Sequence, residues 1–134
     1  FVCDWVYVKP VLPKNNLFTK EFEEKDVLPI PINHGEGRFV FDGDVDHLSR
    51  LVYCDVKGEV CDDFPINPNG SKCNIAGLSN AKGNIMALMP HPERASFSKQ
   101  FPSWIVSDHF DLYSSSPWEK LFVSLKEAIE GVVA

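Results

Sequence analysis

Apolar residues in this chain fall into short runs separated by polar or proline-containing segments. Residues 2–8 are rich in β-branched and aromatic side chains and stop at Pro10, which predicts a strand. Residues 27–33 are also apolar but include Pro29 and Pro31. Because prolines two apart turn their missing N–H groups to the same side, this run is predicted to be an edge strand or an extended segment.

The middle of the chain predicts further short elements. The runs RFVF at 38–41 and LVYCDV at 51–56 indicate strands, and residues 44–50 allow one or two helical turns. Residues 75–78 and 85–89 are apolar runs joined by the glycine-containing segment SNAKGN, which predicts a β-hairpin or two adjacent strands. The second of these runs is apolar at both alternating sets of positions, so it is predicted to be buried on both faces.

The C-terminal segment predicts a helix. Ser116 fits the N-cap, Pro117 the first helical position and Glu119 the capping-box acid. The apolar residues that follow this start at helical spacing form one predicted face: Trp118, Leu121, Phe122, Leu125, Ala128, Ile129 and Val132. Strands followed by one long amphipathic helix indicate an α/β fold, and the pattern alone leaves the topology open.

Length and charge narrow the functional classes. The 134 residues correspond to one domain or part of one, and 44% apolar with 24% charged residues is typical of a globular protein. A net charge of −6 without a basic block argues against a nucleic-acid partner. No apolar run approaches the roughly 20 residues of a membrane span. The chain starts within a strand-like run, without Met, so we expect a fragment or a processed piece of a cytoplasmic protein.

Four cysteines, Cys3, Cys54, Cys61 and Cys73, form no C-x-x-C pair. Reduced thiols are the simplest interpretation for a chain of this size. A zinc site built from the last three with a histidine is the alternative, although structural zinc sites usually present paired ligands at short spacing.

The stretch GNIMALMPHPERA combines a buried-looking strand with chemistry at its end. His91 and Glu93 are two residues apart, and Pro90 and Pro92 restrict the backbone around them. A carboxylate bonded to one imidazole nitrogen leaves the other free to accept a proton, as in a nucleophile–base–acid triad. The competing interpretation is a strand-end turn with a solvated His91 and a Glu93–Arg94 pair, because His-x-Glu alone is a weak pattern.

Three longer motifs in sequence order carry a resemblance: IPINHGEGRFV (30–40), INPNGSKCNIAGLSNAKG (66–83) and NIMALMPHPERA (84–95). Together they resemble the glutaminase part of phosphoribosylformylglycinamidine synthase, within the class I glutamine amidotransferases. The resemblance runs from Phe1 to about Ala95 and returns in the C-terminal helix. It is weaker across 42–63 and 96–114.

The resemblance implies a fold and a reaction. The fold is flavodoxin-like, a mostly parallel sheet flanked by helices on both faces. A cysteine thiolate attacks the glutamine side-chain amide, and His91 and Glu93 stand at the positions of the base and of the residue that orients it. The ammonia passes to a synthetase subunit or domain that uses ATP, Mg and formylglycinamide ribonucleotide. No cofactor is expected in this chain itself.

The family's nucleophile lies in a Gly-x-Cys-x-Gly turn, and no cysteine of this sequence has those neighbours. Residues 1–134 are therefore expected to be the C-terminal part of one amidotransferase domain, inactive without the N-terminal half. The alternative is a non-catalytic module that binds the synthetase without hydrolysing glutamine.

The NHGEGRF segment has two interpretations. It is either a glycine-rich turn with His34 on the surface, or, by resemblance, a border of the glutamine pocket or of the synthetase contact that includes His34 and Gly35. It is not a phosphate loop, because no Lys-Ser/Thr follows the glycines. Four aromatic residues beyond residue 96 are expected either to form an apolar patch that faces a partner or to pack a long loop: Phe101, Trp104, Phe110 and Tyr113. His47 and His109 are expected to be solvated.

Overall fold

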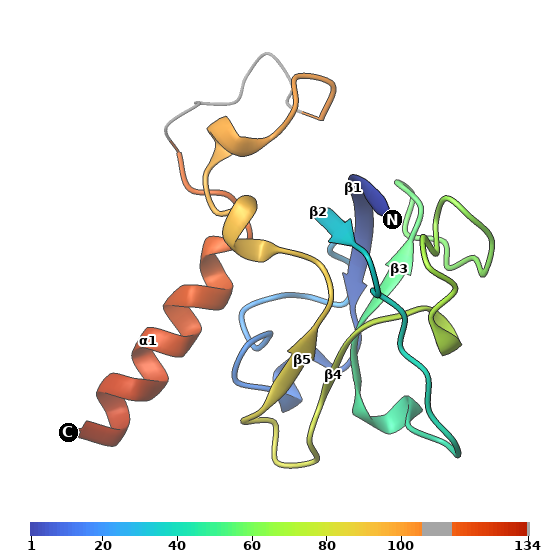
Figure 1. The fold of residues 1–134 in the computed structure, drawn as a ribbon. Helices are drawn as coiled ribbons and strands as arrows, with labels where there is room; N and C mark the ends of the chain where they lie inside the picture. The colour runs from blue at the N-terminus through green and yellow to red at the C-terminus, as the bar shows by residue number, and fades with distance from the viewer. Residues whose placement is uncertain (106–113, 134) are drawn as a thin grey trace.

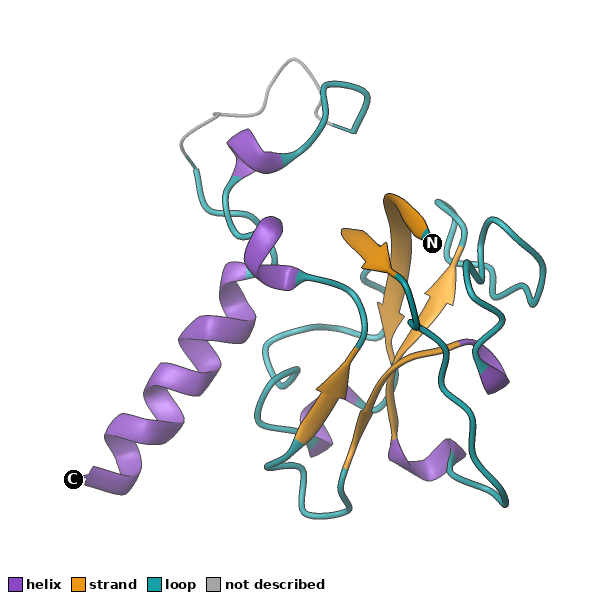
Figure 2. Ribbon diagram, viewed as in Figure 1, coloured by secondary structure: helices purple, strands orange, loops and turns teal. Residues whose placement is uncertain are grey.

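The computed structural model describes residues 1–105 and 114–133. Its strands form one curled sheet in the order β2-β1-β3-β4-β5, and the helix α1 lies beside it (Figure 1). The elements are β1 (Val2–Pro10), β2 (Leu28–His34), β3 (Ser49–Cys54), β4 (Ile75–Ser79), β5 (Met86–Leu88) and α1 (Glu119–Val133). Short 3-10 turns and loops connect them (Figure 2).

The prediction of a mostly parallel sheet is wrong for the described residues, because every strand pairing is antiparallel. A parallel pair needs a crossover of a dozen or more residues, usually a helix. The long helix α1 follows the last strand, so only loops and short 3-10 turns, and no α-helix, connect two of these strands. What holds is a mixed α/β composition with an antiparallel sheet.

The two prolines of β2 behave as their spacing indicates. Pro29 pairs with Tyr7 and Pro31 with Trp5, and β2 forms one edge of the sheet. Because β2 has a neighbouring strand on one side only, its two prolines, which lack an N–H, cost no strand-to-strand hydrogen bond on the free side.

The predicted hairpin is present, since β4 and β5 pair antiparallel from Gly77–Leu88 to Ser79–Met86. The prediction that its second strand is buried on both faces is wrong. β5 is the other edge of the sheet: Met86 and Leu88 are half-buried and Ala87 is exposed. An edge strand has a neighbour on one side only, and its apolar residues are correspondingly less covered.

The predicted strand at 38–41 is absent. The Phe39 backbone instead bonds to a loop: its N–H donates to Ser71 Oγ (3.1 Å), and its carbonyl accepts from the Lys72 N–H (3.1 Å). These loop bonds satisfy the backbone without a ladder.

The core lies between one face of the sheet, the loop after β1 and the start of α1. Val8, Ile30 and Tyr53 from three strands are fully buried with Phe22 and Trp118. The Trp118 ring meets Phe22 edge-on at 5.5 Å, and its Nε1–H donates to the Pro29 carbonyl (2.7 Å). This tryptophan therefore attaches α1 to β2 through both packing and a hydrogen bond.

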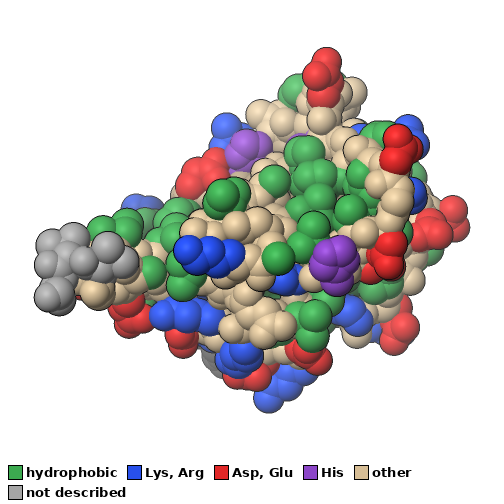
Figure 3. Space-filling model, turned by 90° about the horizontal axis from the view of Figure 1, so that it is seen from below, with side chains coloured by type: hydrophobic (Ala, Val, Ile, Leu, Met, Phe, Trp, Pro, Cys, Tyr) green, Lys and Arg blue, Asp and Glu red, His purple; other side chains and the backbone are tan. Residues whose placement is uncertain are grey.

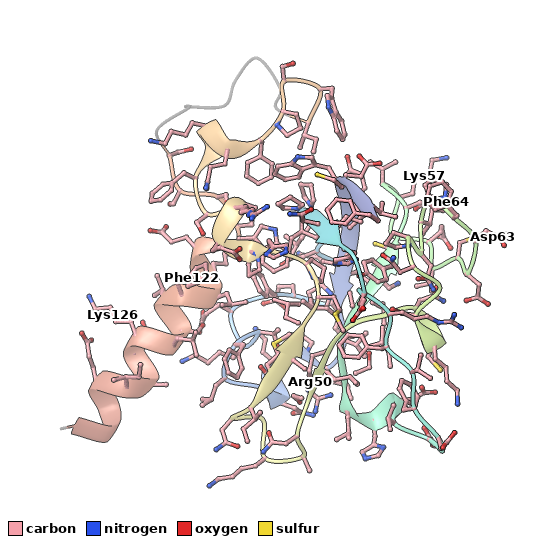
Figure 4. All side chains as sticks on the ribbon, in the orientation of Figure 1. Arg50, Lys57, Asp63, Phe64, Phe122 and Lys126 are labelled. Carbon is pink, nitrogen blue, oxygen red and sulfur yellow. The ribbon has the colours of Figure 1, made fainter. Side chains whose placement is uncertain are left out.

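The Ser116 hydroxyl caps the helix as predicted, but the predicted capping box and the start at Pro117 are not found: the Ser116 N–H donates to the Ser96 carbonyl (2.9 Å) instead of to Glu119. The Ser116 hydroxyl oxygen accepts from the Trp118 N–H (3.1 Å), and the regular helix begins at Glu119. The predicted apolar face is divided, however. Leu121 is buried, whereas Phe122 is 38% exposed and Ile129 64% exposed. The C-terminal end of α1, which carries Ile129, points away from the sheet (Figures 1 and 4).

Candidate functional site

The segment that carries His91 and Glu93 is attached to the edge strand β2. The His91 N–H donates to the Pro31 carbonyl (2.9 Å), so the chain leaving β5 crosses to the opposite edge of the sheet. A single 3-10 turn, η4 (Pro92–Arg94), follows, with Pro92 at its start. The Arg94 and Ala95 N–H groups close this turn on the carbonyls of His91 and Pro92 (3.1 and 3.0 Å). These hydrogen bonds therefore hold the backbone between His91 and Glu93 in one conformation.

The side chains of His91 and Glu93 meet as the spacing predicts. His91 Nδ1 and Glu93 Oε1 are 2.8 Å apart. The two side chains are 32% and 56% exposed, so the pair is open to a reacting molecule on one side. Arg94 Nε lies 3.8 Å from the same Glu93 oxygen, so the interpretation in which Glu93 faces Arg94 describes the weaker of its two contacts. A proton on Nδ1 leaves Nε2 as the basic nitrogen.

His34 is not a surface residue, as the glycine-rich-turn interpretation had it, since only 4% of it is exposed. Its Nδ1 lies 2.8 Å from Asn69 Oδ1, which fixes Nδ1 as the protonated nitrogen because an amide oxygen only accepts. The second ring nitrogen, Nε2, is buried and has no partner among the described residues. The structure thus joins the NHGEGRF and NPNGSK motifs through one hydrogen bond, a contact that the spacing of the two motifs does not predict.

The glycines around His34 hold its ring closely. A Cβ on Gly37 would lie 2.1 Å from His34 Cγ, so no other residue fits without displacing the ring. A Cβ on Gly35 would meet only the Phe1 ring, at an ordinary 3.7 Å. His34 and the Pro31 carbonyl that anchors His91 both belong to β2. The NHGEGRF segment and the turn that carries His91 and Glu93 are therefore attached to the same strand.

The cysteines do not resemble activated nucleophiles. Burial raises the pKa of the Cys54 thiol to about 11, and the Asp46 carboxylate raises the pKa of Cys73. Cys3 is exposed, Cys61 is partly buried, and all four are free thiols. Within residues 1–105 and 114–133, no three histidine, cysteine or acidic side chains gather as a metal cluster.

The aromatic segment after residue 96 contributes in part to packing. The Phe101 ring lies 5.0 Å from Trp5, whereas Trp104 is 65% exposed. The predictions for His109, Phe110 and Tyr113 fall outside the described residues. No helix in the described part of the chain has the length and apolar content to cross a membrane.

The chain belongs to the CobB/CobQ-like glutamine amidotransferase domain family, whose model matches residues 1–127. Individual relatives agree. The phosphoribosylformylglycinamidine synthase subunit PurQ of Saccharolobus solfataricus is 44% identical over 100 residues, which are 72% of this chain and 42% of the relative. The corresponding subunit of Aquifex aeolicus is 43% identical over 102 residues, 72% of this chain and 44% of the relative.

A solved structure also matches. A chain in the structure of PurLQS from Thermotoga maritima superposes with a TM-score of 0.62 at 32% identity, covering 96% of this chain and 48% of that one. The present chain thus spans less than half the length of these relatives.

Proposed function

We propose that this chain supplies the histidine and the glutamate of a Cys-His-Glu glutaminase in phosphoribosylformylglycinamidine synthase. The observation that carries the proposal is the 2.8 Å contact between His91 Nδ1 and Glu93 Oε1, on a turn held by β2. The matching glutamine amidotransferase family model supports the glutaminase assignment, and the relatives named as phosphoribosylformylglycinamidine synthase subunits support purine biosynthesis as its setting. Residues 1–134 act in this proposal as the C-terminal part of one amidotransferase domain.

The chemistry follows from the tautomer. With its Nδ1 proton donated to Glu93, His91 presents the Nε2 lone pair and takes the proton of a cysteine thiol. The resulting thiolate attacks the side-chain amide carbon of glutamine. His91 then returns the proton to the nitrogen as the C–N bond breaks, which releases ammonia and leaves a glutamyl thioester. Water activated by the same imidazole hydrolyses the thioester to glutamate.

The cysteine comes from a Gly-x-Cys-x-Gly segment outside these 134 residues. The sequence contains no such segment, and the raised pKa values of Cys54 and Cys73 disfavour their use as nucleophiles. The chain by itself is therefore inactive as a glutaminase, and the N-terminal half of the domain completes the site.

His34 and Gly35 border this site in the proposal, either on the glutamine side or at the contact with a synthetase. Their position on β2, the strand that anchors His91, supports a place near the reacting groups. The synthetase partner uses ATP and Mg to amidate formylglycinamide ribonucleotide with the released ammonia. The solved relative, described as PurLQS, supports such an assembly.

Affinity labelling tests the assignment of the nucleophile. A glutamine analogue with a reactive leaving group should label none of the four cysteines of the isolated chain above the rate of a free thiol. Mixed with the N-terminal half of a relative, the complex should take up label on the cysteine of that half. Glutamine-protected labelling of Cys3, Cys54, Cys61 or Cys73 would contradict the proposal. A mixed complex that binds glutamine without labelling would favour the alternative, a module that associates without hydrolysis.

A further inference from the structure

A hollow of about 270 Å³ lies where the turn between β4 and β5 meets the loop after β1. Its walls are residues 14–17 with Lys20 on one side, and Lys82 with Gly83 on the other. The connection between β4 and β5 points downward in Figure 1, away from the turn that holds His91 and Glu93. The hollow is therefore separate from the candidate active site.

The lining is basic on an acidic protein. The chain has 13 Lys and Arg against 19 Asp and Glu, yet Lys14, Lys20 and Lys82 line this one hollow and no acidic residue does. Figure 3, which shows the molecule from below, displays lysine and arginine side chains on this lower face, with Asp and Glu side chains among them. Lys14 is paired with Glu23 (3.1 Å), and Lys20 with Glu127 (3.4 Å) and Glu21 (3.9 Å), all outside the lining. Among the described residues, Lys82 has no carboxylate partner within 4.0 Å.

A buried amide adds a second, independent feature. Asn16 lines the hollow and is 3% exposed. Its Oδ1 accepts a hydrogen bond from the Phe18 N–H (2.8 Å), which fixes the orientation of the amide. The Asn16 Nδ2 then has no partner among the described residues. A buried N–H donor without an acceptor is unfavourable, and because Asn16 is part of the lining, an oxygen bound in the hollow is the candidate acceptor for this group.

The two walls are fastened to each other, so the hollow is preformed. The Leu17 N–H donates to the Gly83 carbonyl (2.9 Å). Gly83 has φ of +73°, and a Cβ there would lie 2.3 Å from the Asn15 carbonyl oxygen. Asn80 braces the turn from within, because its Oδ1 accepts from the N–H groups of Asn84 and Ile85 at 3.1 Å.

We propose that this hollow binds the phosphate group of a small molecule. Lysine ammonium groups and a neutral amide N–H are donors only, and together they suit a tetrahedral oxyanion with several acceptor oxygens. A carboxylate has fewer oxygens and would use fewer of these donors. Free phosphate and a phosphate monoester share the recognised group. The proposal does not depend on the proposed glutaminase function, since it uses none of the same residues.

Amide NMR shifts test the proposal on the full chain at constant ionic strength, with inorganic phosphate, ribose 5-phosphate and acetate as probes. Phosphate should shift the amides of residues 14–20 and 82–84 in a saturable way, and acetate should bind more weakly. A tighter response to ribose 5-phosphate would identify a monoester as the ligand, and an equal response would identify free phosphate. Shifts elsewhere, or shifts that do not saturate, would overturn the proposal.

Matched variants assign the donors. Asn16→Asp keeps the acceptor for Phe18 but removes the N–H donor, and Asn15→Asp adds the same charge to the same hollow without removing it. We expect Asn16→Asp to weaken phosphate binding at least about fivefold more than Asn15→Asp. Lys82→Gln should weaken binding about threefold, and Lys57→Gln, on a distant loop labelled in Figure 4, should not. Equal binding by Lys82→Gln and Lys57→Gln, in variants with unchanged melts, would overturn the proposal.

Discussion

In the proposed mechanism Glu93 acts through His91 rather than on the substrate, because its carboxylate contacts the imidazole. It accepts the Nδ1 proton of His91 at 2.8 Å and is more than half exposed. Its proposed contribution is to hold one tautomer of His91 and to stabilise the imidazolium that would form during glutamine hydrolysis. This assignment separates a positioning residue from the base itself.

Glu93→Gln should consequently lower kcat for glutamine hydrolysis about a hundredfold or more in the completed enzyme, with KM little changed. The amide can place its N–H toward Nδ1, which reverses the tautomer. The measurement is steady-state glutamate release across a pH series, and the acidic limb of the profile should move. Glu130→Gln on the exposed face of α1 is the control. A change in KM alone would assign Glu93 to substrate binding instead.

The buried thiol of Cys54 leads to a prediction about the free energy of unfolding at alkaline pH. Burial raises its pKa from 9.0 to about 11, so the folded protein retains a proton that the unfolded chain releases. The stability from this group is complete below pH 9 and is lost as the pH rises through 11, by roughly 2 kcal/mol. Burial raises the pKa of Tyr53 as well, with the same sign. Urea unfolding of Cys54→Ala should show a shallower loss over this range than Cys3→Ala. Parallel curves would contradict the assignment.

At the scale of elements, local patterns predicted much of the structure. The prolines of β2, the β4–β5 hairpin and the Ser116 cap depend on neighbours in sequence, and the structure confirms them. The mostly parallel sheet was expected from the family resemblance alone, and it is wrong for these residues because no α-helix connects two of their strands. The strand predicted at residues 38–41 is absent because the Phe39 backbone forms its hydrogen bonds with Ser71 and Lys72 rather than with another strand.

The candidate site shows the same division. The His91–Glu93 contact follows from a spacing of two residues and a stiff backbone, so it was predictable. The burial of His34 was not, because it depends on Asn69, which lies far along the chain. Gly37 was the signal in the sequence: a glycine is required there because the His34 ring leaves no room for a Cβ, and not because the chain turns.

Gly83 tests how the hairpin turn is fastened to the loop after β1. Gly83→Ala places a Cβ 2.3 Å from a backbone oxygen at φ of +73°, whereas Gly43→Ala has a similar φ of +84° and open space. The first should cost roughly 3 kcal/mol of unfolding free energy, and the second about 1 kcal/mol, the cost of the left-handed backbone alone. Denaturant melts of both variants provide the comparison. Equal losses would mean that the two segments are not held together at Gly83.

At the scale of the whole molecule, apolar surface remains uncovered. Phe122 and Ile129 on α1 are exposed beside half-buried Leu125, and Ile85 next to the β5 edge is 64% exposed. The relatives contain further chain beyond the part that matches this one, and such chain is available to cover this surface. The exposed side chains Phe122 and Ile129 of α1 are therefore a candidate surface for burial against additional chain.

The isolated chain should bind an apolar dye and self-associate in sedimentation, because exposed apolar faces and free strand edges favour association. The double substitution of serine for Phe122 and Ile129 should reduce both dye binding and self-association. Val40→Ser, which removes a 75% exposed side chain from a loop, should change neither. A monomer without dye binding would show that these 134 residues are self-sufficient.

The central claim is that His91 and Glu93 are the base and its orienting acid for a nucleophile supplied by another segment. The most direct measurement is glutamate release from glutamine after this chain is combined with the cysteine-bearing half of a relative. We predict no turnover from either part alone, measurable turnover from the combination, and a loss of about a hundredfold or more with His91→Ala. An active combination in which His91→Ala retains full turnover would contradict the account.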